Sequence, residues 1–120
     1  MSSYFWHIKF AKVMVEIAED ELDKNNYIAI NSLLKAFEEI IDANSALFNL
    51  HFHEEPSIGW KNRIIWIKGK RLYYDWEKII NLINQFYQNK CEKYLEEIIF
   101  IVKKNICILE FNHNKTNDTT

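Results

Sequence analysis

The chain has 120 residues and a mass of 14.5 kDa, and 48% of its residues are apolar while 27% are charged. These values fit one domain with its own core and exclude a disordered chain. The net charge of −2 lacks the basic excess that strong nucleic-acid binders carry.

The first predicted element is a helix from the N-terminus to a turn at Asn25 and Asn26. Trp6, Phe10, Val13, Ile17 and Ala18 mark one face at helical spacing, and we expect this face to lie against the core. Met14 and Leu22 widen it. Acidic residues crowd the second half of the helix. Because asparagine tolerates turn conformations, the two asparagines predict a tight link to the next helix.

The second predicted helix runs from Ile28 to Leu50, because large apolar residues and alanines recur along it every three or four positions. A two-residue link between long helices predicts an antiparallel hairpin. We expect Glu38, Glu39 and Asp42 to lie on its solvated side. Pro56 restricts the residue before it, so the helix ends by residue 55.

Residues 60–75 allow two interpretations. They form either a short helix that closes at Gly69 or a β-hairpin with Gly69 in its turn. We prefer the helix, because an isolated two-stranded hairpin is marginally stable and no other segment offers a strand partner.

The helical period returns at Leu72 and continues to Tyr87, with a joint at residues 88–90. A last helix covers residues 94–109. Phe100 and Ile101 make its apolar run nearly continuous, which predicts a helix buried on most sides, in a central position or at a dimer seam. We therefore predict an all-α fold: an antiparallel four-helix bundle with one additional short helix, over residues 1–111. The polar residues 112–120 predict a disordered tail.

Charge and cysteine content bear on partners and location. Residues 1–55 hold four lysines against ten acidic residues, a net charge of −6, whereas residues 56–120 have a net charge of +4. A chain polarised in this way can associate with itself or with a partner. Cys91 and Cys107 are expected to be buried or half-buried thiols in a reducing compartment. With no export signal and no apolar run of 18 residues, a cytoplasmic protein is expected, with no membrane partner.

The sequence offers little catalytic chemistry. His51 and His53 begin an H-x-H-E-E segment, but a zinc or iron site would need further ligands from elsewhere, and an ordinary polar loop is the simpler interpretation. No glycine-rich phosphate loop or nucleophile elbow is present. We predict no catalytic residues, no metal site and no cofactor.

One segment combines cations with aromatic residues. Both arginines of the chain fall within nine residues of each other, and no acidic residue occurs from Ser57 to Tyr74. Because guanidinium groups bind phosphate and aromatic rings stack on bases, the segment predicts a phosphate or nucleic-acid site. The alternative is that the cations only solubilise a connector and that the apolar residues belong to the core, namely Trp60, Ile64, Ile67 and Trp76. The candidate phosphate-binding residues are Lys61, Arg63, Lys68, Lys70 and Arg71, and the candidate stacking residues are Trp60, Trp66, Tyr73 and Tyr74.

Three stretches support a resemblance to a known family. They are ELDKNNY at residues 21–27, AINSLLKAFEEIIDA at residues 29–43 and GWKNR at residues 59–63. Over residues 5–65 this pattern resembles the HEPN superfamily of helical domains that handle nucleotides and RNA, and it is especially similar to the archaeal repeat-associated branch. Ribonucleases of that superfamily carry an arginine followed four to six residues later by histidine. Neither Arg63 nor Arg71 is followed by histidine in that window.

The resemblance implies a non-catalytic domain that binds a nucleotide, RNA or a partner protein, such as a nucleotidyltransferase-type protein. The alternative function is a homodimeric structural or interaction protein with no small-molecule ligand. A third class, an enzyme whose RNA-cleaving or metal-dependent site is assembled across a dimer, is not expected because the required residues are missing.

Overall fold

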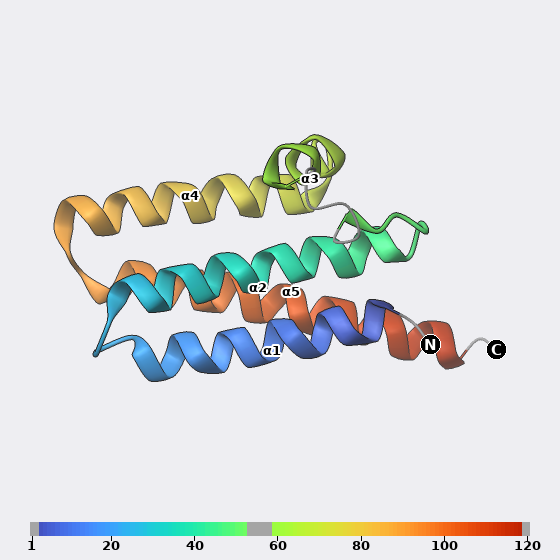
Figure 1. The fold of residues 1–120 in the computed structure, drawn as a ribbon, viewed down its shortest axis with the longest axis horizontal. Coiled ribbons are helices and arrows are strands. Elements are labelled where there is room, and N and C mark those ends of the chain that lie inside the picture. The colour runs from blue at the N-terminus through green and yellow to red at the C-terminus, as the bar shows by residue number, and fades with distance from the viewer. Residues whose placement is uncertain (1–2, 53–58, 119–120) are drawn as a thin grey trace.

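The computed structural model describes residues 3–52 and 59–118, with side chains as far as Asn112. Within these ranges the chain forms five helices and no strand: α1 (Ser3–Glu21), α2 (Asn26–Ala46), α3 (Gly59–Ile67), α4 (Arg71–Asn89) and α5 (Glu92–Asp118). The long helices run roughly side by side, and α3 crosses them at one end (Figure 1). The all-α bundle with one short helix is therefore confirmed, and the hairpin alternative for residues 60–75 is wrong.

The α1–α2 hairpin is closed by asparagine. The Asn25 side chain accepts a hydrogen bond from the backbone N–H of Ile28 at 3.2 Å and caps α2. At its other end α2 stops four residues before the predicted Leu50. There the Ser45 hydroxyl donates to the carbonyls of Asp42 and Leu50, and Asn49 takes a left-handed φ of 60°. These local bonds end the helix before its apolar pattern does.

Two left-handed residues separate the last three helices. Gly69 has a φ of 85° and ends α3, as predicted, and Lys90 has a φ of 55° and ends α4. The backbone N–H of Lys90 bonds to the carbonyl of Phe86 at 2.6 Å, which satisfies one of the last carbonyls of α4. Helix α5 extends to Asp118, beyond the predicted last helical residue Leu109, and the disorder expected of residues 112–120 stays a prediction. No proline or glycine follows Leu109 to stop the helix.

The core side of α1 differs from the prediction. Of the predicted core face, Ala18 is buried and Met14 and Leu22 are half-buried. Trp6, Phe10, Val13 and Ile17 are 42%, 48%, 41% and 36% exposed, so these four large residues face outward instead. The buried side carries Tyr4, His7, Ile8, Ala11, Val15 and Ala18. Its alanines recur seven residues apart, and those of α2 (Ala29, Ala36 and Ala43) do the same and are all fully buried. Small side chains let two helix backbones approach closely, which explains why this stripe packs inside.

Helix α5 is also less buried than predicted. Its buried stripe includes Leu95, Ile98 and Val102, but Phe100 is 69% exposed and both cysteines are exposed free thiols. An ordinary one-sided helix therefore replaces the predicted central one, because α5 packs against α1, α2 and α4 on one side. Among the described helices, none is long and apolar enough to cross a bilayer.

Candidate functional site

The bundle contains a buried group of charged side chains where α1, α2 and α3 meet. We call it the junction cluster. Its members come from all three helices, and four of them are buried while the other two lie at its edge. Burying charge is expensive unless the charges are paired, so such a group must be neutralised internally or by a ligand. The junction cluster consists of His7 on α1, Lys35, Glu38, Glu39 and Asp42 on α2, and Arg63 on α3.

Arg63 and Asp42 form a two-pronged ion pair in this cluster. Nε of Arg63 lies 2.7 Å from Oδ1 of Asp42, and Nη2 lies 2.9 Å from Oδ2. Arg63 is 5% exposed and Asp42 is 2% exposed. Burial lowers the pKa of Arg63, but the acceptors on Asp42 and the charge of Glu38 outweigh it and raise that pKa. Paired donors and acceptors of this geometry fix the position of α3 on α2.

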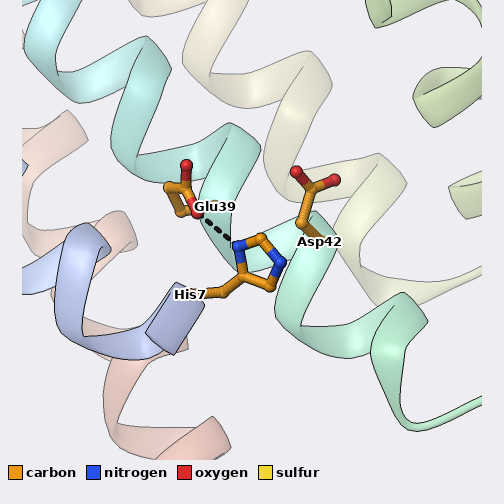
Figure 2. A group of neighbouring side chains, drawn as sticks. All are labelled: His7, Glu39 and Asp42. Atoms are coloured by element: carbon orange, nitrogen blue, oxygen red, sulfur yellow. Dashed lines mark hydrogen bonds and ion pairs between the residues drawn. The ribbon is translucent and has the colours of Figure 1, made fainter. Parts of the chain in front are cut away.

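His7 and Glu39 form the second contact. Nδ1 of His7 lies 2.5 Å from Oε2 of Glu39, and Figure 2 shows the imidazole reaching across from α1 to α2. An ionised carboxylate only accepts hydrogen bonds, so Nδ1 is the donor. Burial raises the pKa of Glu39, but the hydrogen bond and charge of His7, together with Lys35, lower it below its ordinary 4.5.

Three members of the cluster are close enough to share a metal ion. Each of His7, Glu39 and Asp42 offers one possible metal-ligand atom, and these three atoms lie within 4.8 Å of one another. However, both oxygens of Asp42 accept from Arg63, and Nζ of Lys35 lies 3.4 Å from Oε1 of Glu39. A divalent cation would compete with two side-chain cations that already hold these oxygens. Lys35 and Arg63 already balance most of the negative charge that the three carboxylates would offer to a metal.

The burial of this cluster contradicts the sequence-based expectation. Glu39 and Asp42 were expected on a solvated side of the helix, yet both are buried. Ile40, Ile41 and Ala43, next to these acids in sequence, are fully buried, so this turn of α2 lies deep in the bundle. An acid that is buried there needs a buried cation. Arg63 was the available cation, but its distance along the chain hid the pairing.

The predicted phosphate-binding residues do not converge. Arg63 is committed to the junction cluster. Arg71 also has internal partners, since its Nη1 lies 3.3 Å from Oδ2 of Asp75 and donates to the Asn105 side chain. Lys61, Lys68 and Lys70 are exposed. At 100° per residue Lys61 and Arg63 point to opposite sides of α3, and Lys68 and Lys70 follow the end of that helix.

The predicted stacking residues are mostly packed against other side chains. Trp60 stacks on Trp76 with ring centroids 4.6 Å apart. Trp66 packs against Phe48 and carries the ammonium group of Lys70 over its ring at 4.4 Å. Trp60, Trp66 and Tyr73 are half-buried, and only Tyr74 is largely exposed, at 67%. Three of the four aromatic residues thus help to seat α3 and the start of α4.

The H-x-H-E-E segment is only partly described. His51 lies beside the first turn of α1, with Nδ1 3.3 Å from the Ser3 hydroxyl oxygen and Nε2 3.2 Å from Oδ1 of Asn49. Residues 53–55 lie outside the described residues. His51 therefore acts as a link between the end of α2 and the start of α1, and the absence of a metal here stays a prediction.

Helix α1 presents several large apolar side chains to solvent. Its exposed stripe, which we call the α1 stripe, consists of Trp6, Phe10, Val13 and Ile17. Scattered exposed apolar residues are ordinary, but four in helical register make a continuous apolar ridge. Figure 1 shows α1 at one edge of the bundle, with α2 and α5 on one side of it and α3 and α4 beyond them. The sequence analysis grouped these four residues on one side of the helix, but it placed that side against the core.

Comparison of the chain with known proteins gives no further constraint. No family model matches it, and neither a curated protein nor a solved structure is significantly similar to it. Function must therefore be inferred from the buried cluster, the exposed lysines and the α1 stripe.

The lowered pKa of Glu39 leads to a prediction about acid stability. A carboxyl group with a depressed pKa stabilises the fold above its unfolded value of 4.5, and this contribution is lost as the pH falls through the folded value. We expect Glu39→Gln to lower the free energy of unfolding by about 1–3 kcal/mol at pH 7, and by less at pH 3. Urea unfolding at both pH values, at one protein concentration, measures the difference.

The matched control is Glu97→Gln on α5, whose side chain is exposed. It should change the free energy of unfolding by less than about 0.5 kcal/mol at either pH. A Glu39→Gln effect that is equal at pH 7 and pH 3 would show that the charge of Glu39 does not stabilise the fold.

Proposed function

We propose that this chain is a non-catalytic helical interaction domain that binds a protein through the α1 stripe. The observation that carries the proposal is the outward-facing register of Trp6, Phe10, Val13 and Ile17 on a helix whose other side fills the core. Exposing such a ridge promotes association with other apolar surfaces, and aromatic residues are enriched at the centres of interfaces. A domain of this kind is compatible with a HEPN-like protein that lacks the arginine–histidine pair.

The buried charges support an interaction role over a catalytic one. A catalytic acid or base must reach its substrate, whereas the carboxylates of Glu39 and Asp42 are buried and engaged by side chains of the same chain. The shallow groove between α1 and α5, with a volume of about 320 Å³, is lined by other residues, among them Val15 and Ile106. The junction cluster then acts as a clamp that holds α3 on the α1–α2 hairpin, and the α1 stripe lies outside this clamp.

A photo-crosslinking side chain in place of Phe10 tests the proposal. In the purified protein and in an extract of the source cells, we expect covalent adducts of the mass of a second protein chain. The same group in place of Tyr74 should give none. Adding Val13→Glu, which puts a charge into the stripe, should abolish the Phe10 adducts. If Phe10 forms no protein adduct, or forms adducts that survive Val13→Glu, the proposed function is wrong.

One observation favours a second candidate function, which is the binding of RNA or a nucleotide. Lys61, Lys68 and Lys70 are exposed, and no acidic residue occurs in residues 59–74. With three phosphate contacts instead of the five that the sequence suggested, the salt dependence of binding is predicted to be shallow. Raising the salt from about 50 to 200 mM should weaken binding to single-stranded RNA about 20-fold, whereas five contacts would give about 130-fold.

Filter binding at the two salt concentrations measures this dependence. Lys61→Ser combined with Lys68→Ser should remove most of the binding, and Lys78→Ser on α4 is the matched control. Should the wild-type protein fail to retain RNA or nucleotide even at low salt, the second candidate is rejected.

A further inference from the structure

The α1 stripe is symmetric about its own midpoint. Its four residues are spaced by four, three and four positions, so they read the same in both directions along the helix. In an antiparallel copy of α1 centred between Phe10 and Val13, Trp6 would face Ile17 and Phe10 would face Val13. Each layer then pairs one aromatic ring with one smaller aliphatic side chain, which is how ridges interdigitate. From Trp6 to Ile17 the seam would extend about 16 Å along the helix axis.

We infer that the partner of the α1 stripe is a second copy of this chain, with the two α1 helices packed antiparallel about a two-fold axis. The inference rests on the proposed function and names the partner. An interface related by a two-fold axis uses the same surface on both subunits, so one self-complementary stripe is sufficient. Helix α1 packs on α2 and α5 with its opposite side, so within the described residues no helix covers the stripe.

The charges beside the stripe favour the antiparallel direction. Lys9, Glu16 and Asp20 lie along one edge of it, at helical spacings of seven and four residues. A two-fold axis brings this edge against the same edge of the second copy, with its direction reversed. Lys9 of each copy then lies near Glu16 of the other, offset by about 3 Å along the axis. In a parallel pair the two-fold axis would set this edge against the opposite edge of the second copy, where Lys9 has no acidic residue at its level.

The charged side chains of α1 that could pair across the seam have no ion-pair partner within the described part of the chain. Lys12 is paired with Glu110, and Glu19 with Lys103, so these four charges are used within the chain. In the described part of the chain, no ion pair involves Lys9, Glu16 or Asp20; Lys9 lies over the ring of Trp6 at 5.1 Å. The antiparallel pair also places the acidic end of one α1 beside the positive N-terminal end of the other helix dipole. Acidic residues at this edge disfavour an anionic lipid surface as the occupant.

Charge reversal tests both the partner and the direction. We expect the wild-type chain to sediment as a dimer, and Lys9→Glu or Glu16→Lys alone to weaken the dimer about tenfold at low salt. Each variant by itself sets like charges against each other. A mixture of the two variants restores both pairs, so native mass spectrometry should show mainly the mixed dimer. In a parallel pair residues 9 and 16 of the two copies would lie on opposite edges of the seam and would not meet, and a second measurement separates the two cases.

That measurement uses Trp6→Cys and Ile17→Cys in chains whose Cys91 and Cys107 are replaced by serine. In the antiparallel pair the Trp6→Cys chain should crosslink to the Ile17→Cys chain under mild oxidation, and neither chain should crosslink to itself. Self-crosslinking of either variant would show a parallel pair and overturn the inference. Val13→Glu should leave the helical circular dichroism unchanged and give a monomer.

The failures of the two proposals can be told apart. If the chain sediments as a monomer up to about 100 μM while Phe10 crosslinks specifically to another protein, the second-copy inference is wrong and the proposed function stands. A dimer that is unaffected by Val13→Glu uses another surface and also overturns the inference. Binding to vesicles of anionic lipid through the stripe, with no protein adduct at Phe10, would reject both.

Discussion

Asp42→Ala is expected to lower the free energy of unfolding by about 3–5 kcal/mol, which is a large part of the stability of a small domain. The substitution removes both acceptors of the Arg63 guanidinium, which is 5% exposed and cannot lose its proton. Arg63 must then either stay buried without its main partner or leave the core together with α3. Urea unfolding monitored by circular dichroism, at one protein concentration, measures the loss.

Two further variants separate loss of the charge pair from loss of packing. Glu96→Ala on α5 removes an exposed carboxylate and should change stability by less than about 0.5 kcal/mol. Asp42→Leu combined with Arg63→Met replaces both charges by apolar groups and should recover most of the loss, because no buried charge is then left unpaired. Hydrogen exchange in residues 59–67 should be fast in Asp42→Ala and slow in the double variant. If both variants were equally unstable, packing rather than charge would explain the effect.

The helices could be predicted because they depend on local patterns. Apolar spacing, the asparagine turn and Gly69 all act within a few residues of their position, and the structure has helices and turns at those places. The ends were less predictable. Helix α2 stops at Ala46 because the Ser45 hydroxyl closes its last turn, and that competition between a side chain and the backbone leaves the apolar pattern unchanged.

The side of α1 that enters the core could not be decided from its own sequence. The helix has two apolar stripes, one rich in large residues and one built around Ala11 and Ala18. Hydrophobicity favours the first stripe, but close packing against the alanines of α2 favours the second. Which stripe is buried depends on the partner helix, so it becomes visible only when α1 and α2 are considered together.

The candidate site shows the same limit. Arg63 carried the phosphate-binding prediction because it lies in an acid-free, aromatic segment. In the fold its nearest charges come from α2, 21 residues earlier in the chain, and they convert a ligand-binding candidate into an internal clamp. Sequence composition identifies which side chains can bind an anion, but it does not reveal whether the protein supplies the anion itself.

Trp76→Ala is the second substitution for which a large loss is expected, about 3–5 kcal/mol. Trp76 lies between two other rings, with its centroid 6.0 Å from Phe37 on α2 and 4.6 Å from Trp60 on α3. Removing it leaves a void among three helices and ends both ring contacts. Such contacts stabilise the fold by more than the burial of their apolar area alone. Urea unfolding gives the loss, and Tyr74→Ala, at an exposed position two residues earlier, is the matched control that should cost less than about 0.5 kcal/mol.

Trp76→Ala and Asp42→Ala should both release α3, but through different contacts. The ion pair fixes one side of α3 to α2, and the ring stack fixes its first turn to α4 and, through Trp76, to α2. If both contacts hold the same docked helix, the double variant should lose less free energy of unfolding than the two single variants lose in sum. The reason is that α3 can be released only once. If α3 were held by the covalent connection to α4 alone, the losses would be additive, and hydrogen exchange in residues 59–67 would respond to neither substitution.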